Sequence, residues 1–329
     1  MRKNSENNES CTFRTSIGGQ ALLEGILMRG PEKQAIVCRL ADGGLKDRVE
    51  DVKPNPVSKI PFLRGVPVFL SSMFKGMEAV TYSAELLPEE EQGEPDKLDL
   101  WLEKHLGGEK ARKAVIAIAA VLGIALSVGL FVLLPAFFYS LLPDSLHLVV
   151  RCLIEGAVRI VIFLAYLWLM TRLPDMQRMF AYHGAEHKSI FCYEKGLEMT
   201  VENVRGQSRF HPRCGTSFLV VTMLMAILVV SVMTWALSLI PGIAALPRIP
   251  ATLVRVLGKL IVLPVIVSVT YELNRWVGRH DGNPIARAAA WPGKQIQRLT
   301  TREPDDGMIE VAIAALKKVI PAQKGADAW

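Results

Sequence analysis

The sequence has 329 residues, half of them hydrophobic, and a net charge of +6 at neutral pH. Soluble domains of this length are rarely so apolar, so the composition favours a membrane protein over an ordinary soluble enzyme. We attribute the positive charge to membrane topology and to attraction for anionic lipids, and we expect no specific nucleic-acid binding.

The chain starts with a polar segment and continues into a glycine-rich one. Residues 1–16 lack the short apolar core of a secretory signal and are expected to be disordered. Segment 17–60 opens with IGGQALLEGILMRGP, which has no lysine placed as in a phosphate-binding loop. Residues 34–52 then alternate around Asp42-Gly43, which predicts a small β-hairpin.

The next two segments are expected to lie outside the membrane core. Residues 61–87 are apolar but contain charges and a proline, which favours an amphipathic helix at the membrane surface or against the bundle. A re-entrant or additional spanning segment is the alternative. Residues 88–113 are expected to be an acidic linker followed by a short segment before the first span.

Four apolar stretches within residues 114–273 are long enough to cross a membrane, which takes about 20 residues as a helix. Two are free of charge. The other two carry charged residues, and soluble core helices are the alternative for them. The predicted spans are Ala114–Leu134, Val149–Met170, Ser217–Ile240 and Ala251–Leu273.

The two spans that carry charge contain six charged residues, of which Arg151, Arg255 and Glu272 lie near span ends and three lie deeper. Glu155 and Arg159 are four positions apart and can pair on one helix face, and Lys259 lies in the last span. Ionisable groups in membranes often line a path for ions or substrates. Internal pairing that fixes helix packing is the interpretation that we favour.

Lysine and arginine are concentrated before residue 114, in the loop 171–216 and in the tail 274–329. The positive-inside rule then places both termini and this loop in the cytoplasm. An odd number of cysteines without a paired framework agrees with a reducing compartment. The expected fold is an all-α bundle of four transmembrane helices with a cytoplasmic α+β cap.

The tail is expected to end in a helix. Glu303-Pro304-Asp305 is a start signal, and Lys317-Lys318 suits a helix C-terminus. The apolar residues between them follow helical spacing at Ile309, Ala312, Ile313 and Leu316.

The loop 171–216 carries the residues that point to chemistry. His183, Glu186 and His187 form an H-x-x-E-H pattern, in which two imidazoles on one helix face can bind one ion. The same order occurs in inverted zinc metallopeptidases, where the glutamate is the general base. His211 and Cys214 add ligand types that zinc prefers. The pattern therefore predicts a zinc site, or one for another divalent transition metal.

Several alternatives stay open for these residues. The histidines and Glu186 could instead hydrogen-bond lipid headgroups or the tail. A closed site of His183, His187, His211 and Cys214 would be structural, whereas an open position would bind water beside Glu186. The acidic group Glu303, Asp305 and Asp306 is most simply a helix start, although a carboxylate could also reach the metal.

Four blocks of the sequence resemble the YqhQ family of bacterial membrane proteins: GGQALLEGILMRGP, YHGAEHKSIFCYE, HPRCGTSF and RLTTREPDDGMIEVAI. The resemblance runs from about Ser16 to Leu316 and implies a predicted metal-dependent enzyme without an established reaction. It marks Gly18, Gly19, Gln20, Glu24, Gly25, Met28, Arg29 and Gly30; His183, Glu186, His187 and Lys188; His211, Pro212, Arg213, Cys214 and Gly215; and Thr300, Thr301, Glu303, Pro304, Asp305 and Asp306.

Three functions are compatible with these features. The first is a metal-dependent enzyme, best suited to hydrolysis, with Glu186 as base. The second is a membrane scaffold whose structural zinc organises the cap for a protein partner. The third, less favoured, is a transporter that uses Glu155, Arg159 and Lys259. The bilayer is an expected partner, and a homo-oligomer is possible.

Overall fold

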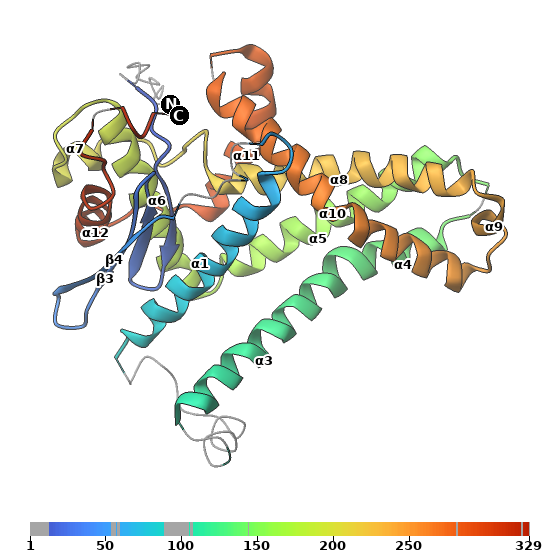
Figure 1. Cartoon of the computed structure of the whole chain (residues 1–329), viewed down its shortest axis with the longest axis horizontal. Helices are drawn as coiled ribbons and strands as arrows, with labels where there is room; N and C mark the ends of the chain where they lie inside the picture. Colours follow the sequence, from blue (N-terminus) through green and yellow to red (C-terminus); the bar gives the residue numbers. More distant parts are fainter. Residues whose placement is uncertain are drawn as a thin grey trace. The chain divides into compact units, whose positions relative to one another are not determined.

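The computed structural model describes residues 13–53, 57, 60–88, 105, 108–143, 145–280, 282–323 and 325–328. The expected disorder of residues 1–12 and most of the acidic linker therefore lie outside the described residues. The chain divides into two compact units (Figure 1). The first contains residues 1–88, 169–221 and 270–329, and the second contains residues 89–168 and 222–269.

The first unit is built on a four-stranded antiparallel sheet in the order β1-β2-β3-β4. The predicted hairpin is present as β3 and β4, and Gly43 adopts a positive φ of 83° in its turn. The glycine-rich segment forms a further hairpin, β1 and β2, which the sequence did not predict. The strands are β1 (Gly18–Leu22), β2 (Gly25–Arg29), β3 (Lys33–Arg39) and β4 (Leu45–Asp51).

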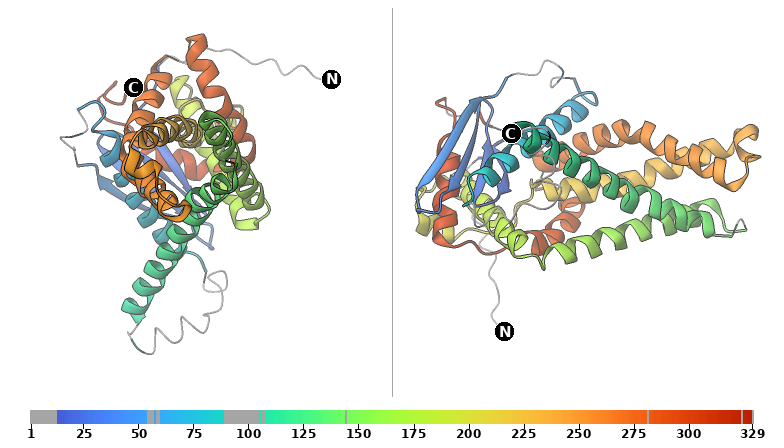
Figure 2. Two further views of the ribbon diagram at one scale, coloured as in Figure 1. Left: turned by 90° about the vertical axis from the view of Figure 1, so that its right-hand side faces the viewer. Right: turned by 90° about the horizontal axis from the view of Figure 1, so that it is seen from below.

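Helices cover both faces of this sheet because its apolar residues alternate in direction along β2 and β3. On one face, Ile26, Met28, Ala35 and Val37 pack with α6 (Pro174–Glu194) and α12 (Asp306–Lys317). On the other face, Leu22, Leu27, Ile36 and Cys38 pack with α1 (Gly65–Glu85). In the right-hand view of Figure 2 the blue strands lie between red and cyan helices.

The C-terminal helix α12 lies where the sequence placed it. The Asp305 side chain accepts a hydrogen bond from the Met308 N–H at 2.8 Å and caps the helix, as its position after Pro304 suggested. Ile309, Ala312, Ile313 and Leu316 are buried. The first unit also contains α7 (Val201–Arg205) and α11 (Pro284–Thr300).

Residues close to the two ends of the chain pair with each other in the first unit. The Ser16 N–H donates to the Asp327 carbonyl oxygen at 2.6 Å, and Thr15 forms a β-bridge with Ala328. The Thr15 hydroxyl donates to the Asp327 carboxylate at 2.6 Å. Thr15 and Asp327 are both buried, so this junction is part of the core.

The second unit is helical. In the described part of the chain, three helical stretches are long and apolar enough to cross a membrane: Ala114–Leu141, Phe218–Ser238 and Ile249–Arg279. The first stretch includes α3 (Gly108–Val128), a π-helical turn (Gly129–Leu133) and α4 (Leu134–Leu141), and the others belong to α8 (Gly215–Ser238) and α10 (Arg248–Arg279). The predicted second span is helix α5 (Leu148–Met170), which is not one of the three. A short helix, α9 (Pro241–Ala244), lies between α8 and α10.

Candidate metal centre

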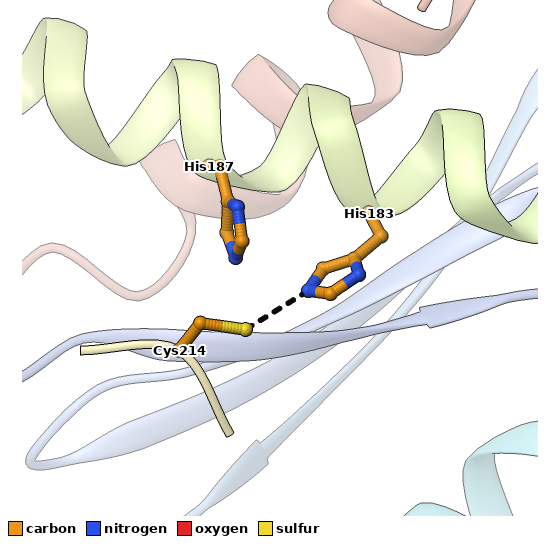
Figure 3. Close-up of side chains that lie close together, drawn as sticks. All are labelled: His183, His187 and Cys214. Atoms are coloured by element: carbon orange, nitrogen blue, oxygen red, sulfur yellow. Dashed lines mark hydrogen bonds between the residues drawn. The ribbon is translucent and has the colours of Figure 1, made fainter. Parts of the chain in front are cut away.

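Helix α6 presents His183 and His187 on one face, one turn apart, as the four-residue spacing requires. Cys214, the residue before α8, supplies a thiol to the same place, as Figure 3 shows. Among the described residues, the ligand atoms of these three side chains all lie within 4.8 Å of one another. His183 Nε2 and Cys214 Sγ are 3.2 Å apart. Two imidazoles and a thiolate at this separation form a ligand set suited to zinc.

Backbone carbonyl groups fix the orientation of both imidazoles. His183 Nδ1 lies 2.8 Å from the Thr300 carbonyl oxygen, and His187 Nδ1 lies 2.6 Å from that of Arg209. A carbonyl oxygen only accepts hydrogen bonds, so each Nδ1 carries the proton. The Nε2 atom of each ring is then the one available to a metal, and such outer contacts are typical of histidine ligands.

Glu186 lies beside the three ligands and is buried. Its Oε1 accepts a hydrogen bond from the Gly19 N–H of strand β1 at 2.9 Å. Within the described residues, Glu186 Oε2 and His187 Nε2 are buried without a hydrogen-bond partner. Buried polar atoms are seldom left unpaired, so two of them beside a thiol fit a site for a cation and a water molecule.

The electrostatics favour an ionised thiol. Burial opposes ionisation of Cys214, but its electrostatic interactions with His187 and His183 hold its pKa well below the ordinary value. Burial likewise disfavours a charged His183, yet the nearby Cys214 thiolate outweighs it and raises the pKa of this imidazole to about 9. Burial raises the pKa of Glu186. Both shifts favour the thiolate form of Cys214, which is the form that ligates a metal.

His211 does not join this group. Its Nε2 lies 3.4 Å from Arg213 Nη2 and 3.6 Å from Glu194 Oε2, and burial lowers the pKa of the imidazole to about 4. Gln297 accepts a hydrogen bond from the His211 N–H and donates one to its carbonyl oxygen, both at 2.8 Å. His211 and Arg213 therefore hold the loop in place, and His211 as a fourth ligand stays a prediction.

Two of the three acidic residues in the TTREPDD segment form ion pairs with basic residues of other segments. Glu303 pairs with Lys188 at 2.8 Å, and Asp306 pairs with Arg205 at 2.5 Å. With Asp305 acting as the α12 cap, each of these carboxylates has a structural role. None belongs to the group of possible ligands found among the described residues.

The GGQALLEGILMRGP segment contributes to the candidate metal centre mainly through the backbone N–H of Gly19. Gly19 holds Glu186, whereas Glu24 forms an ion pair with Arg178 and lies 3.2 Å from the Tyr182 hydroxyl. Gly18 faces open space, and Gln20 lies against Gly76 of α1. Arg29 ends strand β2 opposite Gly18.

Three charged residues from the interior of the predicted spans lie together in the second unit. Glu155 forms an ion pair with Lys259 and another with Arg159 at 3.1 Å. Arg159 Nε also donates to the Phe131 carbonyl oxygen in the π-helical turn at 3.0 Å. These contacts agree with the packing interpretation of the charges.

A comparison with protein families supplies the identity of the chain. The model of the DUF1385 family, described as a protein of unknown function, matches residues 60–322. The chain belongs to the DUF1385 family. It is also similar to the uncharacterized protein YqhQ of Bacillus subtilis (strain 168), with 31% identity over 313 residues that cover 92% of each chain. No solved structure matches it.

These findings confirm the YqhQ family resemblance seen in the sequence. The residues matched by the family model include His183, Glu186, His187 and Cys214 and begin after the sheet. Neither description assigns a reaction or a metal, so the functional argument rests on the geometry of the site.

Four contributors to the site escaped the sequence analysis. They are the Thr300 and Arg209 carbonyl groups, the Gln297 side chain and the small residue Gly184. The family resemblance marked Thr300 itself, and Gly184 lies inside the block YHGAEHKSIFCYE, but neither had an assigned role at the site. Backbone acceptors have no side-chain signature, so spacing rules do not reveal them.

Proposed function

We propose that this protein is a metal-dependent enzyme, best suited to hydrolysis, whose site lies on the cytoplasmic side of the inner membrane. The observation that carries the proposal is the convergence of His183, His187 and Cys214 beside Glu186. Zinc is the metal that this ligand set favours. When bound, it would polarise a carbonyl or phosphoryl oxygen and make a bound water more acidic.

The protein residues divide into ligands and a base. His183, His187 and Cys214 would supply three ligands, which leaves a fourth position for water or substrate. Glu186 Oε2 would accept the proton of that water, while Gly19 holds the other carboxylate oxygen in place. The raised pKa of Glu186 makes it a stronger base than an ordinary carboxylate.

The cytoplasmic placement rests on charge and chain organisation. Residues 1–88, 169–221 and 270–329, which hold most of the lysines and arginines, form one compact unit. Their shared unit supports the proposal that these segments emerge on the same side of the membrane. With α5 as a fourth crossing, the positive-inside rule assigns that side to the cytoplasm.

The decisive test of the enzyme proposal is Glu186→Gln. The amide keeps an oxygen that can accept the Gly19 hydrogen bond, but it removes the base, which typically costs about 10²–10⁴-fold in rate. We expect the variant to express and fold normally and to fail to restore the phenotype of a deletion strain. Glu202→Gln, at an exposed position on α7, serves as the matched control. Full complementation by Glu186→Gln would rule out its role as base.

A second candidate function, thiol-based nucleophilic catalysis, is favoured by one specific contact. Cys214 Sγ lies 3.2 Å from His183 Nε2 and 3.4 Å from the Thr216 N–H, at the start of the 24-residue helix α8. An imidazole and a helix N-terminus are the two features that most often activate a cysteine.

Alkylation of Cys214 distinguishes the two functions. Because its pKa is lowered, the thiolate persists as the pH falls below the ordinary value of 9.0, and reactivity is lost only when the pH passes the lowered pKa. For a metal ligand, we expect rapid reaction with iodoacetamide at pH 7 after chelation and strong protection when zinc is restored. Reactivity that zinc leaves unchanged would favour the nucleophile instead.

A further inference from the structure

Helix α1 packs on the sheet through its smallest residues. Gly76, Ala79 and Ser83 are buried, and Ala79 lies in the cluster with Leu22, Leu27, Ile36 and Cys38. A Cβ atom at Gly76 would lie 2.3 Å from the Gln20 side chain, so the helix approaches the sheet closely. The larger Val80 and Tyr82, near the end of the helix, are only partly buried against the same cluster, so the fully buried residues of α1 are small ones.

The large apolar residues of α1 lie on a different side, which we call the apolar side and define as Phe69, Leu70, Met73, Phe74 and Met77. Phe74 is 63% exposed, Leu70 42% and Met77 41%. The positions follow helical spacing, so they form one continuous strip. The preceding turn adds exposed Ile60, Phe62 and Leu63. Contiguous exposed apolar surface of this kind marks a binding surface for a protein or a membrane.

The charged residues in the middle of α1 pair with strand β4 or with each other. Lys75 pairs with Glu50 of β4 at 3.1 Å and with Glu78 at 3.0 Å. Arg48 of β4 also pairs with Glu78 at 2.6 Å. The polar side of the helix is therefore turned to the last strand of the sheet, and the apolar side has no charged residue.

Two contacts within the first unit tie the start of α1 to the ends of candidate spans. Phe69 stacks on Phe218, the first residue of the Phe218–Ser238 span, with ring centroids 6.2 Å apart. Arg64 forms a bidentate ion pair with Glu272, near the end of the Ile249–Arg279 span, at 2.7 and 2.5 Å. Both side chains of that pair are largely buried.

We infer that the apolar side of α1 lies in the boundary layer of the lipid bilayer, on the face of the membrane where these spans end. A span end marks the level of the headgroups, and the Phe69–Phe218 contact brings α1 to that level. An apolar strip without charge suits the acyl-chain boundary, into which interfacial helices sink by about 5–10 Å. The small residues hold the sheet against the opposite side, so α1 anchors the first unit to the membrane.

This surface can be tested with Phe74→Cys in full-length protein reconstituted at one copy per lipid nanodisc. A charged, water-soluble maleimide is applied, and labelling is followed peptide by peptide, so that native thiols are counted separately. Ala41→Cys is the control, because Ala41 is exposed in the β3–β4 turn. We expect position 74 to react about tenfold more slowly than position 41, as burial in the headgroup and acyl boundary requires.

A photoactivatable phospholipid provides the direct readout, and we expect it to cross-link to the peptide that contains Phe74 in the unsubstituted protein. Leu70→Cys repeats the labelling test at a second position of the apolar side. Equal labelling at positions 74 and 41 would overturn the inference. Protection that appears only with two copies per disc would also overturn it, because a second copy of the chain would then be the occupant.

Discussion

Loss of bound metal is expected when any one of His183→Ala, His187→Ala or Cys214→Ser is introduced. Each substitution removes one of three ligand atoms that lie within 4.8 Å of one another. Losing one of three protein ligands should weaken binding by at least the ~10–100-fold seen when only an outer contact is removed. Elemental analysis of the purified protein, with zinc titration against a chelator of known affinity, measures the effect.

Three further variants separate ligands from their neighbours. Glu186→Gln should keep the metal, because Glu186 is assigned as base. His280→Ala, at an exposed histidine outside the site, is the matched control. His211→Ala tests the four-ligand version, and retained metal there would leave the fourth position open. Absence of stoichiometric metal in the unsubstituted protein would contradict the metal proposal as a whole.

Gly184→Ala is expected to destabilise the first unit severely. A Cβ atom at this position would lie 2.1 Å from the Arg302 carbonyl oxygen, where backbone must move to accommodate it. The Arg302 N–H also donates to the Phe180 carbonyl oxygen at 2.8 Å, which holds this segment against α6. Overpacking of this kind costs about 1–3 kcal/mol and occasionally more. Thermal unfolding of the purified protein should show the loss.

The same substitution should weaken metal binding, because Thr300 orients His183 from the displaced segment. Gly215→Ala is the matched control, since a Cβ atom there meets open space beside the same site. We expect it to unfold at the temperature of the unsubstituted protein. If Gly184→Ala also unfolded at the temperature of the unsubstituted protein, residues 300–302 could not approach α6 as closely as described here.

The apolar runs and the histidine spacing were readable from sequence because each depends on local chemistry. The predicted stretch Ser217–Ile240 corresponds to Phe218–Ser238, and Ala251–Leu273 lies inside Ile249–Arg279. His183 and His187 converge because four residues make about one helical turn. Cys214 comes from a different part of the chain and lies beside them in the fold. The HPRC sequence predicted that this segment would reach the histidines of α6, but it did not show whether His211 or Cys214 would lie closer to them.

The features that were missed depend on tertiary contacts. Strands β1 and β2 were hidden by glycines, which weaken strand propensity, and they are stabilised by α6, α12 and α1 from distant parts of the chain. His211 was expected to be a ligand because its side chain suits zinc. Its Nε2 lies near the buried Glu194 and Arg213 pair, and its role as a ligand stays a prediction.

The first unit is assembled from residues far apart in the sequence, as the pairing of Thr15 with Asp327 shows, and this affects when it can fold during synthesis. The sheet is synthesised before the three candidate spans of the described residues, but the α12 helix that covers one of its faces is synthesised after them. Until α12 has been synthesised, Ile26, Met28 and Val37 lack one of the helices against which they pack. Folding of the first unit is therefore completed after membrane insertion, and chains truncated before residue 306 would expose an apolar sheet face to chaperones and proteases.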